Sequence, residues 1–201
     1  MSNTHHERTL VIIKPDGIQR SLIGEIVSRF ERSGLKLTAM KMMVPSNEHV
    51  EKHYTIDPEW VRLAGEKSIA SAHKRGHDPV STDPIVVGQF VLTSLKKYLT
   101  SGPVVAMVWQ GPHAVEIVRK LVGSTEPLSS DVGTIRGDYV VDSYQFANAH
   151  TRAVRNLVHA SGALSEAEKE IPHWFSKHEI VEYTHINEKI LSDVNVDGIV
   201  E

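Results

Sequence analysis

The sequence predicts an α+β fold built on one antiparallel sheet, with helices packed on one face of that sheet. Three observations favour it. Short runs of apolar and β-branched residues alternate with segments whose apolar residues recur at helical spacing. No internal repeat or low-complexity tract divides the chain. With 201 residues, of which 40% are hydrophobic, the chain can bury the core of one domain but is short for two.

Four segments are predicted to be strands, and they are residues 9–14, 35–44, 103–109 and 153–159. A helix is expected after the first strand and another after the third, because their apolar residues share one face and a glycine follows each of them at position 34 or 123. The apolar residues are Ile23, Ile26, Val27 and Phe30 in the first helix, and Ala114, Val115, Val118 and Val122 in the second.

A last helix is expected to begin at Ser165. Ser165 and Glu168 have the spacing of a capping box, and the helix should turn Ala167, Ile171 and Trp174 toward the core. The resulting order of elements, β-α-β-β-α-β, is that of a ferredoxin-like fold.

The segment from about 57 to 100 fits this order least well. Asp57-Pro58 and Asp83-Pro84 each predict a helix start, with Asp as the N-cap and Pro as the first helical residue. The polar residues 66–83 between them are expected to form a solvated surface. The apolar stripe of the second of these helices consists of Val87, Val91, Leu95 and Tyr98.

Composition excludes several classes of function. The formal charge of −3, from 22 Lys and Arg against 25 Asp and Glu, is too close to neutral to predict binding to nucleic acid or to a membrane surface. The absence of cysteine excludes disulfides and thiol catalysis. The longest apolar run, at 104–109, is too short to cross a bilayer, and the first residues do not resemble a signal peptide. We therefore expect a soluble protein, and a cytoplasmic location is the simplest interpretation.

Phosphate-binding groups must come from side chains, because the sequence contains neither a Walker A loop nor a Gly-x-Gly-x-x-Gly turn. Lys14 ends the first predicted strand, Arg119 lies in a helix, and Arg136 lies in a loop between glycines. Each alone is usually an ordinary surface cation. Strand and helix ends of this fold can converge on one cleft, so the three cations together with His159 suggest a phosphate site.

His159, in the stretch "RNLVHAS", can be a core histidine, a metal ligand or a nucleophile. A neutral imidazole has a free lone pair, so it can attack phosphorus and pass the phosphoryl group to a second acceptor. Glu170, in the helix that follows, could fix the tautomer of the ring by a hydrogen bond. Metal binding is the weaker interpretation, because no His-x-x-x-His or His-x-Glu pair surrounds His159.

Seven motifs together resemble the nucleoside diphosphate kinase family over residues 8–56 and 91–183. They are "RTLVIIKPDGIQRSLIGEIVSRFE", "HY" at 53–54, "SGPVVAMVWQG", "RKLVGSTEP", "GTIRGD", "RNLVHAS", and "EKEI" followed by "WF". The resemblance implies a single domain over residues 1–201 that transfers the γ-phosphoryl group of a nucleoside triphosphate, typically ATP, to a nucleoside diphosphate. The reaction would be ping-pong, through a phosphohistidine at His159. The alternative is a catalytically weak regulatory or scaffold member of the same fold.

The same resemblance implies roles for individual residues. The catalytic set would be His159, Lys14, Glu170, Ser161 and Tyr54, and the nucleotide-binding set Lys14, Arg119, Thr125, Arg136 and Asn156. Mg²⁺ is expected as the cofactor, held mainly by the phosphates of the nucleotide and not by direct protein ligands. A homo-oligomer is expected, either a tetramer or a hexamer built from dimers.

The chain departs from the family pattern in three places. Gly162 stands where many members have Asp, which removes an indirect contact to the metal. The interval from Tyr54 to Ser101 is longer by roughly thirty residues, and the two Asp-Pro helix starts predict a helical insertion at about 58–90, as an added lid or an oligomer contact. The residue that stacks on the base is Val91, with Phe90 beside it, if counted back from Ser101, and Trp60 if counted from Tyr54.

An extension at about 184–201 ends the chain as either an ordered arm or a loose tail.

Overall fold

The structure is a computed structural model that describes residues 7–193. Its sheet contains β1 (Arg8–Ile13), β2 (Lys36–Met43), β3 (Val104–Gln110) and β4 (Val158–Ala160) in the order β2-β3-β1-β4. Each neighbouring pair of strands is antiparallel. This order confirms the predicted ferredoxin-like sheet, and it places the short strand β4 beside β1, with His159 opposite Ile12.

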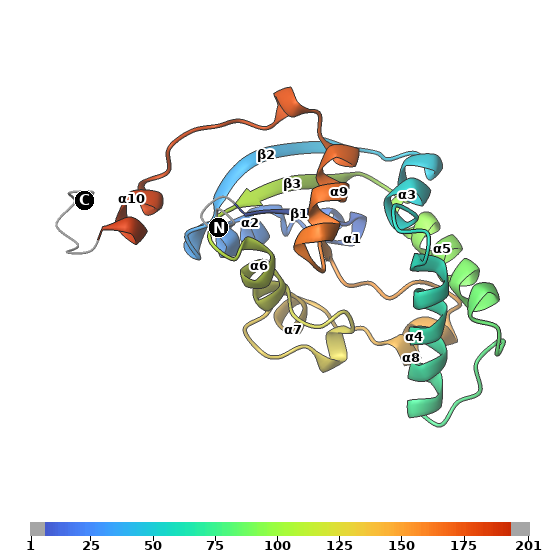
Figure 1. Ribbon diagram of the computed structural model, residues 1–201. Coiled ribbons are helices and arrows are strands. Elements are labelled where there is room, and N and C mark those ends of the chain that lie inside the picture. Colours follow the sequence, from blue (N-terminus) through green and yellow to red (C-terminus); the bar gives the residue numbers. More distant parts are fainter. Residues whose placement is uncertain (1–6, 194–201) are drawn as a thin grey trace.

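The helices connect and cover these strands (Figure 1). The α-helices are α1 (Pro15–Gln19), α2 (Ile23–Arg32), α3 (Asn47–Tyr54), α4 (Trp60–Lys74), α5 (Pro84–Leu99), α6 (Ala114–Val122), α7 (Ile135–Tyr139), α8 (Tyr144–Ala149), α9 (Leu164–Trp174) and α10 (Ile186–Ser192). Two single turns of 3₁₀-helix, η2 (Pro127–Ser129) and η3 (Lys177–Glu179), complete the order. Within the described residues, no helix has the length and apolarity needed to span a bilayer.

Both faces of the sheet are covered, so the expectation of helices on one face is wrong. Val11 and Ile13 of β1 belong to a core shared with α2 and α6, whereas Leu10 and Ile12 belong to a second core shared with α9. Alternate residues of a strand point to opposite faces, and here both sets are apolar. Figure 1 shows α9 crossing the strands, and it buries the three residues predicted to face the core, Ala167, Ile171 and Trp174.

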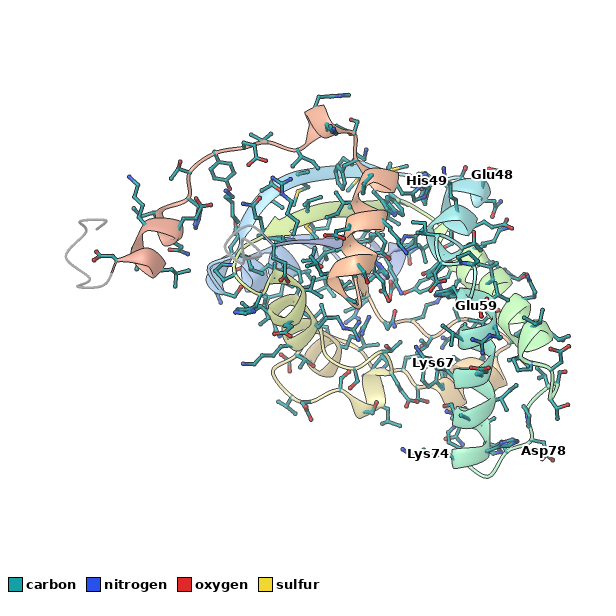
Figure 2. The ribbon with its side chains drawn as sticks, in the orientation of Figure 1. Glu48, His49, Glu59, Lys67, Lys74 and Asp78 are labelled. Atoms are coloured by element: carbon teal, nitrogen blue, oxygen red, sulfur yellow. The ribbon has the colours of Figure 1, made fainter. Side chains whose placement is uncertain are left out.

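The predicted insertion forms an antiparallel pair of helices, α4 and α5, at the edge of the domain beside α3 (Figure 1). The two helices touch through glycines: a Cβ at Gly65 would lie 1.8 Å from the carbonyl oxygen of Pro84, and a Cβ at Gly88 would lie 1.9 Å from that of Val61. Labelled side chains Glu59, Lys67 and Lys74 follow the length of α4 in Figure 2. The polar stretch expected as surface thus forms more than half of α4 and its connection to α5.

One of the two predicted Asp-Pro helix starts is confirmed. Asp83 caps α5, and its side chain accepts a hydrogen bond from the N–H of Ile85 at 2.8 Å. Asp57 instead lies in a turn, where its carboxylate accepts from the N–H of Glu59 at 3.0 Å, and α4 begins only at Trp60.

Two further boundaries differ from the prediction. β4 covers three residues and not the whole of 153–159, because Leu157 has a left-handed conformation (φ 61°) that interrupts an extended strand. α9 begins at Leu164, with Ala163 and not Ser165 as the N-cap. The contact that stabilises this end comes from Glu166, whose carboxylate accepts a hydrogen bond from the N–H of Gly162 at 2.8 Å.

Residues 181–188 form an arm along β2, and this arm includes the start of the predicted C-terminal extension. Val181 N–H donates to the Thr38 carbonyl at 2.8 Å, and the Lys36 ammonium donates to the Tyr183 carbonyl at 2.8 Å and pairs with Glu188 of α10 at 2.5 Å. Residues 194–201 of that extension lie outside the described residues.

Candidate active site

His159 projects from β4 toward α9. Its Nε2 lies 3.0 Å from Oε1 of Glu170, and the other carboxylate oxygen of Glu170 accepts a hydrogen bond from the Ser161 hydroxyl at 2.5 Å. Ser161 is in turn fixed to the sheet, because its hydroxyl oxygen accepts from the N–H of Leu10 at 3.2 Å. A carboxylate only accepts, so this arrangement puts the imidazole proton on Nε2 and leaves the lone pair on Nδ1.

Glu170 stays ionised in this position. Burial opposes its charge, but the electrostatic interaction and hydrogen bond with His159, the interaction with His53 and the hydrogen bond from Ser161 together lower the pKa of the carboxyl to about 2. The imidazole therefore faces a full negative charge at every physiological pH. Such a charge stabilises a positive charge on the ring more than it stabilises the neutral ring.

His53 belongs to this cluster although it was not singled out from the sequence. Its buried ring contacts the His159 ring edge to face at 4.6 Å, and its Nδ1 accepts a hydrogen bond from the Trp174 indole N–H at 3.2 Å. Burial and the nearby His159 hold the pKa of His53 well below its usual value, so the ring is neutral. The only sequence signal was its place in the "HY" motif, of which Tyr54 alone was assigned a role.

His53, His159 and Glu170 are also close enough to share a metal ion, since their donor atoms lie within 4.8 Å of one another. The closest of these atoms are already paired, however, because His159 Nε2 bonds to Glu170 and His53 Nδ1 accepts from Trp174. These hydrogen bonds use His159 Nε2, Glu170 Oε1 and His53 Nδ1, whereas the buried Nε2 of His53 has no hydrogen-bond partner among the described residues.

Lys14 lies at the end of β1, as expected, but it is buried. Its ammonium donates a hydrogen bond to Oδ1 of Asn156 at 2.6 Å, and Nδ2 of Asn156 donates to the carbonyl of Thr125 at 2.9 Å. Burial, with the charge of Arg136, lowers the pKa of Lys14 to about 7. Three residues predicted to bind nucleotide, Lys14, Thr125 and Asn156, are thus joined in one network.

Arg136 is buried and holds several loops together. Its guanidinium donates to the carbonyls of Gly123 and Ser124 at 3.0 Å each, of Asn156 at 3.2 Å, and of Val158 at 2.6 Å. These contacts use all but one of the five N–H groups of a guanidinium. Burial, with the charge of Arg119, lowers the pKa of Arg136 to about 10, which still leaves it charged. This scaffold role was not predicted.

Arg119 on α6 completes the predicted cations. It is half-buried, and no described residue accepts a hydrogen bond from its side chain. The electrostatic effect that it has on Arg136 shows that the two guanidinium groups are neighbours. Among the described residues, Arg119 is therefore the predicted cation with all of its side-chain donors available for a ligand.

Tyr54 lies between the histidine cluster and the insertion. Its ring is 4.8 Å from the ring of His53 and 4.9 Å from that of Trp60, and burial raises the pKa of its hydroxyl. Of the candidates for base stacking, Trp60 is thus connected to the cluster through aromatic contacts. Val91 and Phe90 lie on α5, and no described aromatic ring lies against Phe90, which is 47% exposed.

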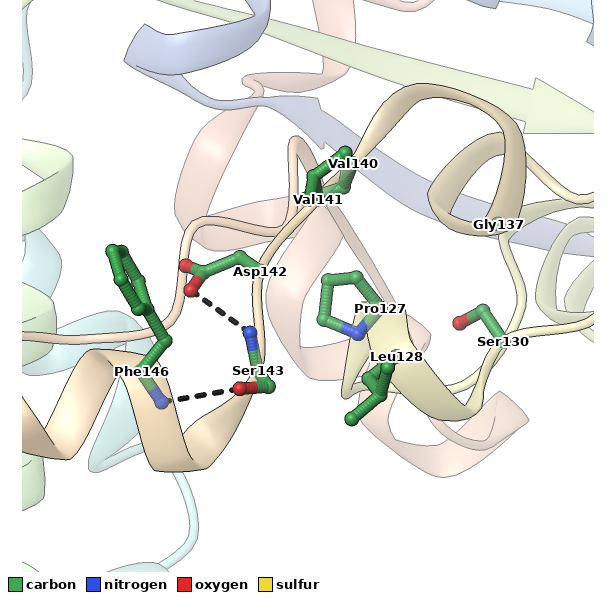
Figure 3. A pocket seen from close by; sticks show the side chains of 9 residues that line it. All are labelled: Pro127, Leu128, Ser130, Gly137, Val140, Val141, Asp142, Ser143 and Phe146. Atoms are coloured by element: carbon green, nitrogen blue, oxygen red, sulfur yellow. Dashed lines mark hydrogen bonds between the residues drawn. The ribbon is translucent and has the colours of Figure 1, made fainter.

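A surface hollow of about 460 Å³ lies between η2, α7 and α8, where Leu128, Val141 and Phe146 are exposed (Figure 3). None of the residues predicted from the sequence lines it. Its lining is Pro127, Leu128, Ser130, Gly137, Val140, Val141, Asp142, Ser143 and Phe146.

A family of known proteins matches this chain over most of its length. The family model described as "Nucleoside diphosphate kinase" matches residues 7–60 and 86–180. The unmatched residues between the two segments fall in the α4–α5 pair, as the predicted insertion requires.

Among curated proteins, the chain is 52% identical over 180 residues to a nucleoside diphosphate kinase of Pyrobaculum aerophilum, an alignment covering 88% of this chain and 98% of that protein. It is 40% identical over 177 residues to nucleoside diphosphate kinase B of Homo sapiens, an alignment covering 88% of this chain and 91% of that protein.

Solved structures give the same result. The crystal structure of an NDP kinase from Pyrobaculum aerophilum superimposes with a TM-score of 0.84 at 49% identity, covering 88% of this chain and 100% of that chain. The structure of a nucleoside-diphosphate kinase from Borrelia burgdorferi is described as a transition state mimic with bound vanadate and ADP. It superimposes with a TM-score of 0.76 at 36% identity, covering 92% of this chain and 96% of that chain.

Proposed function

We propose, from the premise that this chain belongs to the nucleoside diphosphate kinase family, that His159 carries the phosphoryl group that the enzyme moves between nucleotides. The chain is a nucleoside diphosphate kinase, an enzyme of phosphoryl transfer. The observation that supports a role for His159 is the 3.0 Å contact between its Nε2 and Glu170. That contact fixes the proton on one nitrogen and leaves the other as a nucleophile.

In the first half-reaction, Nδ1 of His159 would attack the γ-phosphorus of a nucleoside triphosphate. A P–N bond forms while the bond from the γ-phosphorus to the bridging oxygen breaks, and a nucleoside diphosphate leaves. The proton on Nε2 stays in place. Glu170 stabilises the positive charge that develops on the ring, and Ser161 orients Glu170.

In the second half-reaction, a terminal phosphate oxygen of another nucleoside diphosphate would attack the phosphohistidine. The P–N bond breaks, the ring returns to its neutral state, and a new triphosphate leaves. Because the two nucleotides use the same groups in turn, a ping-pong mechanism follows.

Charge on the transferring phosphates would be neutralised by Lys14, Arg119 and Arg136. Arg119 offers free donors, whereas Arg136 contributes its charge and one remaining N–H. We assign Asn156 and Thr125 to the rim that holds the nucleotide, Tyr54 to the wall beside His53, and Trp60, in preference to Val91 or Phe90, to the base.

Mg²⁺ bound to the phosphates of the nucleotide would further neutralise their charge. The residues beside His159 fit a hydrated ion of this kind. The Glu166 carboxylate lies 2.8 Å from where a Cβ at Gly162 would be, so an acidic group is present near the position where many members of the family have Asp. The proposal also includes a homo-oligomer built from dimers and a cytoplasmic location.

The test is to incubate the enzyme with ATP labelled on its γ-phosphate and with Mg²⁺, and to map acid-labile label. We expect label on His159, loss of both label and nucleotide exchange in His159→Ala, and retention of both in His77→Ala, which changes an exposed histidine between α4 and α5. Label on a serine, or label that survives His159→Ala, would contradict the mechanism. An unlabelled wild-type protein that still binds nucleotide would indicate the regulatory alternative.

A further inference from the structure

Tyr98, on α5, joins two parts of the active site that are distant in sequence. Its hydroxyl donates a hydrogen bond to Oδ1 of Asp16 at 2.6 Å and accepts one from the N–H of Asn156 at 3.3 Å. The second oxygen of Asp16 accepts from the N–H of Leu157 at 3.2 Å. Asp16 and Tyr98 thus satisfy two consecutive N–H groups just before the strand that carries His159.

Those two N–H groups belong to a strained turn. Leu157 has φ 61°, a left-handed conformation that costs free energy in a residue with a side chain. Such a conformation persists only where its surroundings fix it. Here Asp16 holds the N–H of Leu157, and the N–H of Lys14 donates to its carbonyl at 2.7 Å. The turn sets the direction in which the chain enters β4, two residues before His159.

The ring of Tyr98 also lies against two cations. The Lys14 ammonium is 5.2 Å from the ring centroid, and the Arg155 guanidinium is 4.2 Å from it. Contacts of this kind stabilise a cation over an aromatic ring. The Lys14 ammonium therefore has two fixed partners, the ring of Tyr98 and Oδ1 of Asn156, and the backbone of Asn156 is itself held by Tyr98.

Asp16 affects the pKa of Lys14 in the opposite direction from the other groups around it. Burial lowers the pKa of Lys14 most, the charges of Arg136 and Arg155 lower it further, and Asp16 is the group that raises it. Without Asp16, less of the side chain would be in the ammonium form that attracts phosphate.

We propose that Asp16 and Tyr98 are positioning residues for phosphoryl transfer, with Tyr98 fixing the Asn156–Leu157 turn and the Lys14 ammonium, and Asp16 fixing the Tyr98 hydroxyl and the N–H of Leu157. The inference rests on the proposed function, because it assigns Lys14 to the phosphates of the nucleotide. Neither residue touches the reacting atoms, so both act through Lys14 and through the path of β4.

The charge of Asp16 can be tested through the pH dependence of kcat/KM, which reports the free enzyme. Lys14 loses its proton as the pH rises through about 7 in the free protein, so kcat/KM should fall on the alkaline side. Asp16→Asn removes a charge that raises this pKa, and the alkaline fall should therefore begin at lower pH. Tyr98→Phe keeps the charge of Asp16, so its alkaline fall should stay in place while kcat/KM decreases about tenfold at every pH.

The control is Tyr139→Phe. It removes a hydroxyl that donates to Glu25 at 2.6 Å, the same type and length of bond as that from Tyr98 to Asp16, but at the surface. We expect its pH profile and kcat/KM to equal those of the wild type. Thermal unfolding of all three variants reports whether each is folded.

A direct measurement separates this inference from the proposed function. The Cε resonance of Lys14 can be followed by NMR through a pH titration without nucleotide, with Lys14→Arg identifying the signal. A midpoint lower in Asp16→Asn than in the wild type supports the inference whether or not His159 is phosphorylated. An unchanged midpoint, or Tyr98→Phe with wild-type kcat/KM, overturns it, whereas a wild-type enzyme without phosphohistidine overturns the proposed function alone.

Discussion

At the scale of single residues, the site depends on which groups already have partners. His159, Glu170 and Ser161 form a closed chain in which each polar atom but Nδ1 of the imidazole is held by a neighbour. The remaining nitrogen is thus both oriented and free. Preorganisation of this kind lowers the barrier because no group has to reorient as charge develops.

Glu170→Gln should slow transfer without weakening nucleotide binding. The amide has nearly the same shape, but it replaces a hydrogen bond to a charged group, worth about 1.5–3 kcal/mol, with a neutral one. We expect kcat to fall roughly 10- to 100-fold while the KM for nucleotides changes little. Steady-state kinetics with two nucleotide pairs measures both quantities.

Glu166→Gln is the matched control for Glu170→Gln, because Glu166 lies on the same helix, is exposed and does not contact His159. At saturating Mg²⁺ its kcat should exceed that of Glu170→Gln. Equal kcat values in Glu170→Gln and the wild type would show that the carboxylate charge has no part in the reaction.

The site residues proposed from the sequence are those with a chemical role of their own. His159, Lys14 and Glu170 were identifiable because nucleophile, cation and carboxylate follow from the chemistry, and the motifs fixed their numbers. His53, Asp16 and Tyr98 were not singled out as site residues, because their contacts join segments that are far apart in the sequence. The scaffold role of Arg136 could not be predicted either. Its acceptors are main-chain carbonyls, and every residue type carries one.

At the scale of elements, the regular segments were predictable and the irregular ones were not. Strands β1, β2 and β3 and helices α2 and α6 follow from apolar periodicity and from the glycines at 34 and 123, both of which have positive φ. The length of β4 was overestimated, since the left-handed Leu157 leaves no pattern in an apolar run. The second covered face of the sheet was missed although its strands are apolar on both sides, which is the pattern of a doubly covered sheet.

The close contact between α4 and α5 should make Gly88→Ala destabilising. The added methyl would lie 1.9 Å from the carbonyl oxygen of Val61, so the helices would have to separate along their length. Forced overpacking costs about 1–3 kcal/mol, or a fall in melting temperature of several degrees for a domain of this size. Calorimetry or circular dichroism can measure the change.

Gly24→Ala in α2 is the comparison, because no atom lies within 4 Å of the position of its Cβ. That variant should melt at the wild-type temperature or slightly above, as alanine favours helix. If Gly88→Ala melted no lower than Gly24→Ala, the two helices would not be in backbone contact.

At the scale of the whole molecule, the insertion contacts the body of the domain near both ends of α4. Near its start, Trp60 packs against Tyr54, and at the far end of α4 the Arg75 guanidinium lies 5.7 Å from the ring of Tyr144 on α8. The α4–α5 pair therefore spans from α3 to α8. This span favours the lid over the oligomer contact, the two roles that the sequence left open.

Replacing residues 66–83 with a short Gly-Ser linker should test the lid. Gly65 and Pro84 are in contact, so the linker can join them without moving α5. We expect a higher KM for nucleotides, because Arg75 and the cover over Tyr144 are lost. The number of subunits in the assembly, measured by sedimentation, should stay unchanged. A change in assembly state with unchanged KM would instead indicate an oligomer contact, and no change in either would reject both roles. Val80→Ser, in the same exposed loop, is the control.

The buried ammonium of Lys14, at the end of β1, should couple nucleotide binding to an exchange of protons with the solution. Burial lowers the pKa of Lys14 to about 7, so the binding of a polyanion beside it would raise that pKa and take up protons from the solution, and its departure would release them. Each catalytic cycle would then include a small reversible uptake of acid. The heat released on nucleotide binding would then depend on which buffer supplies the protons.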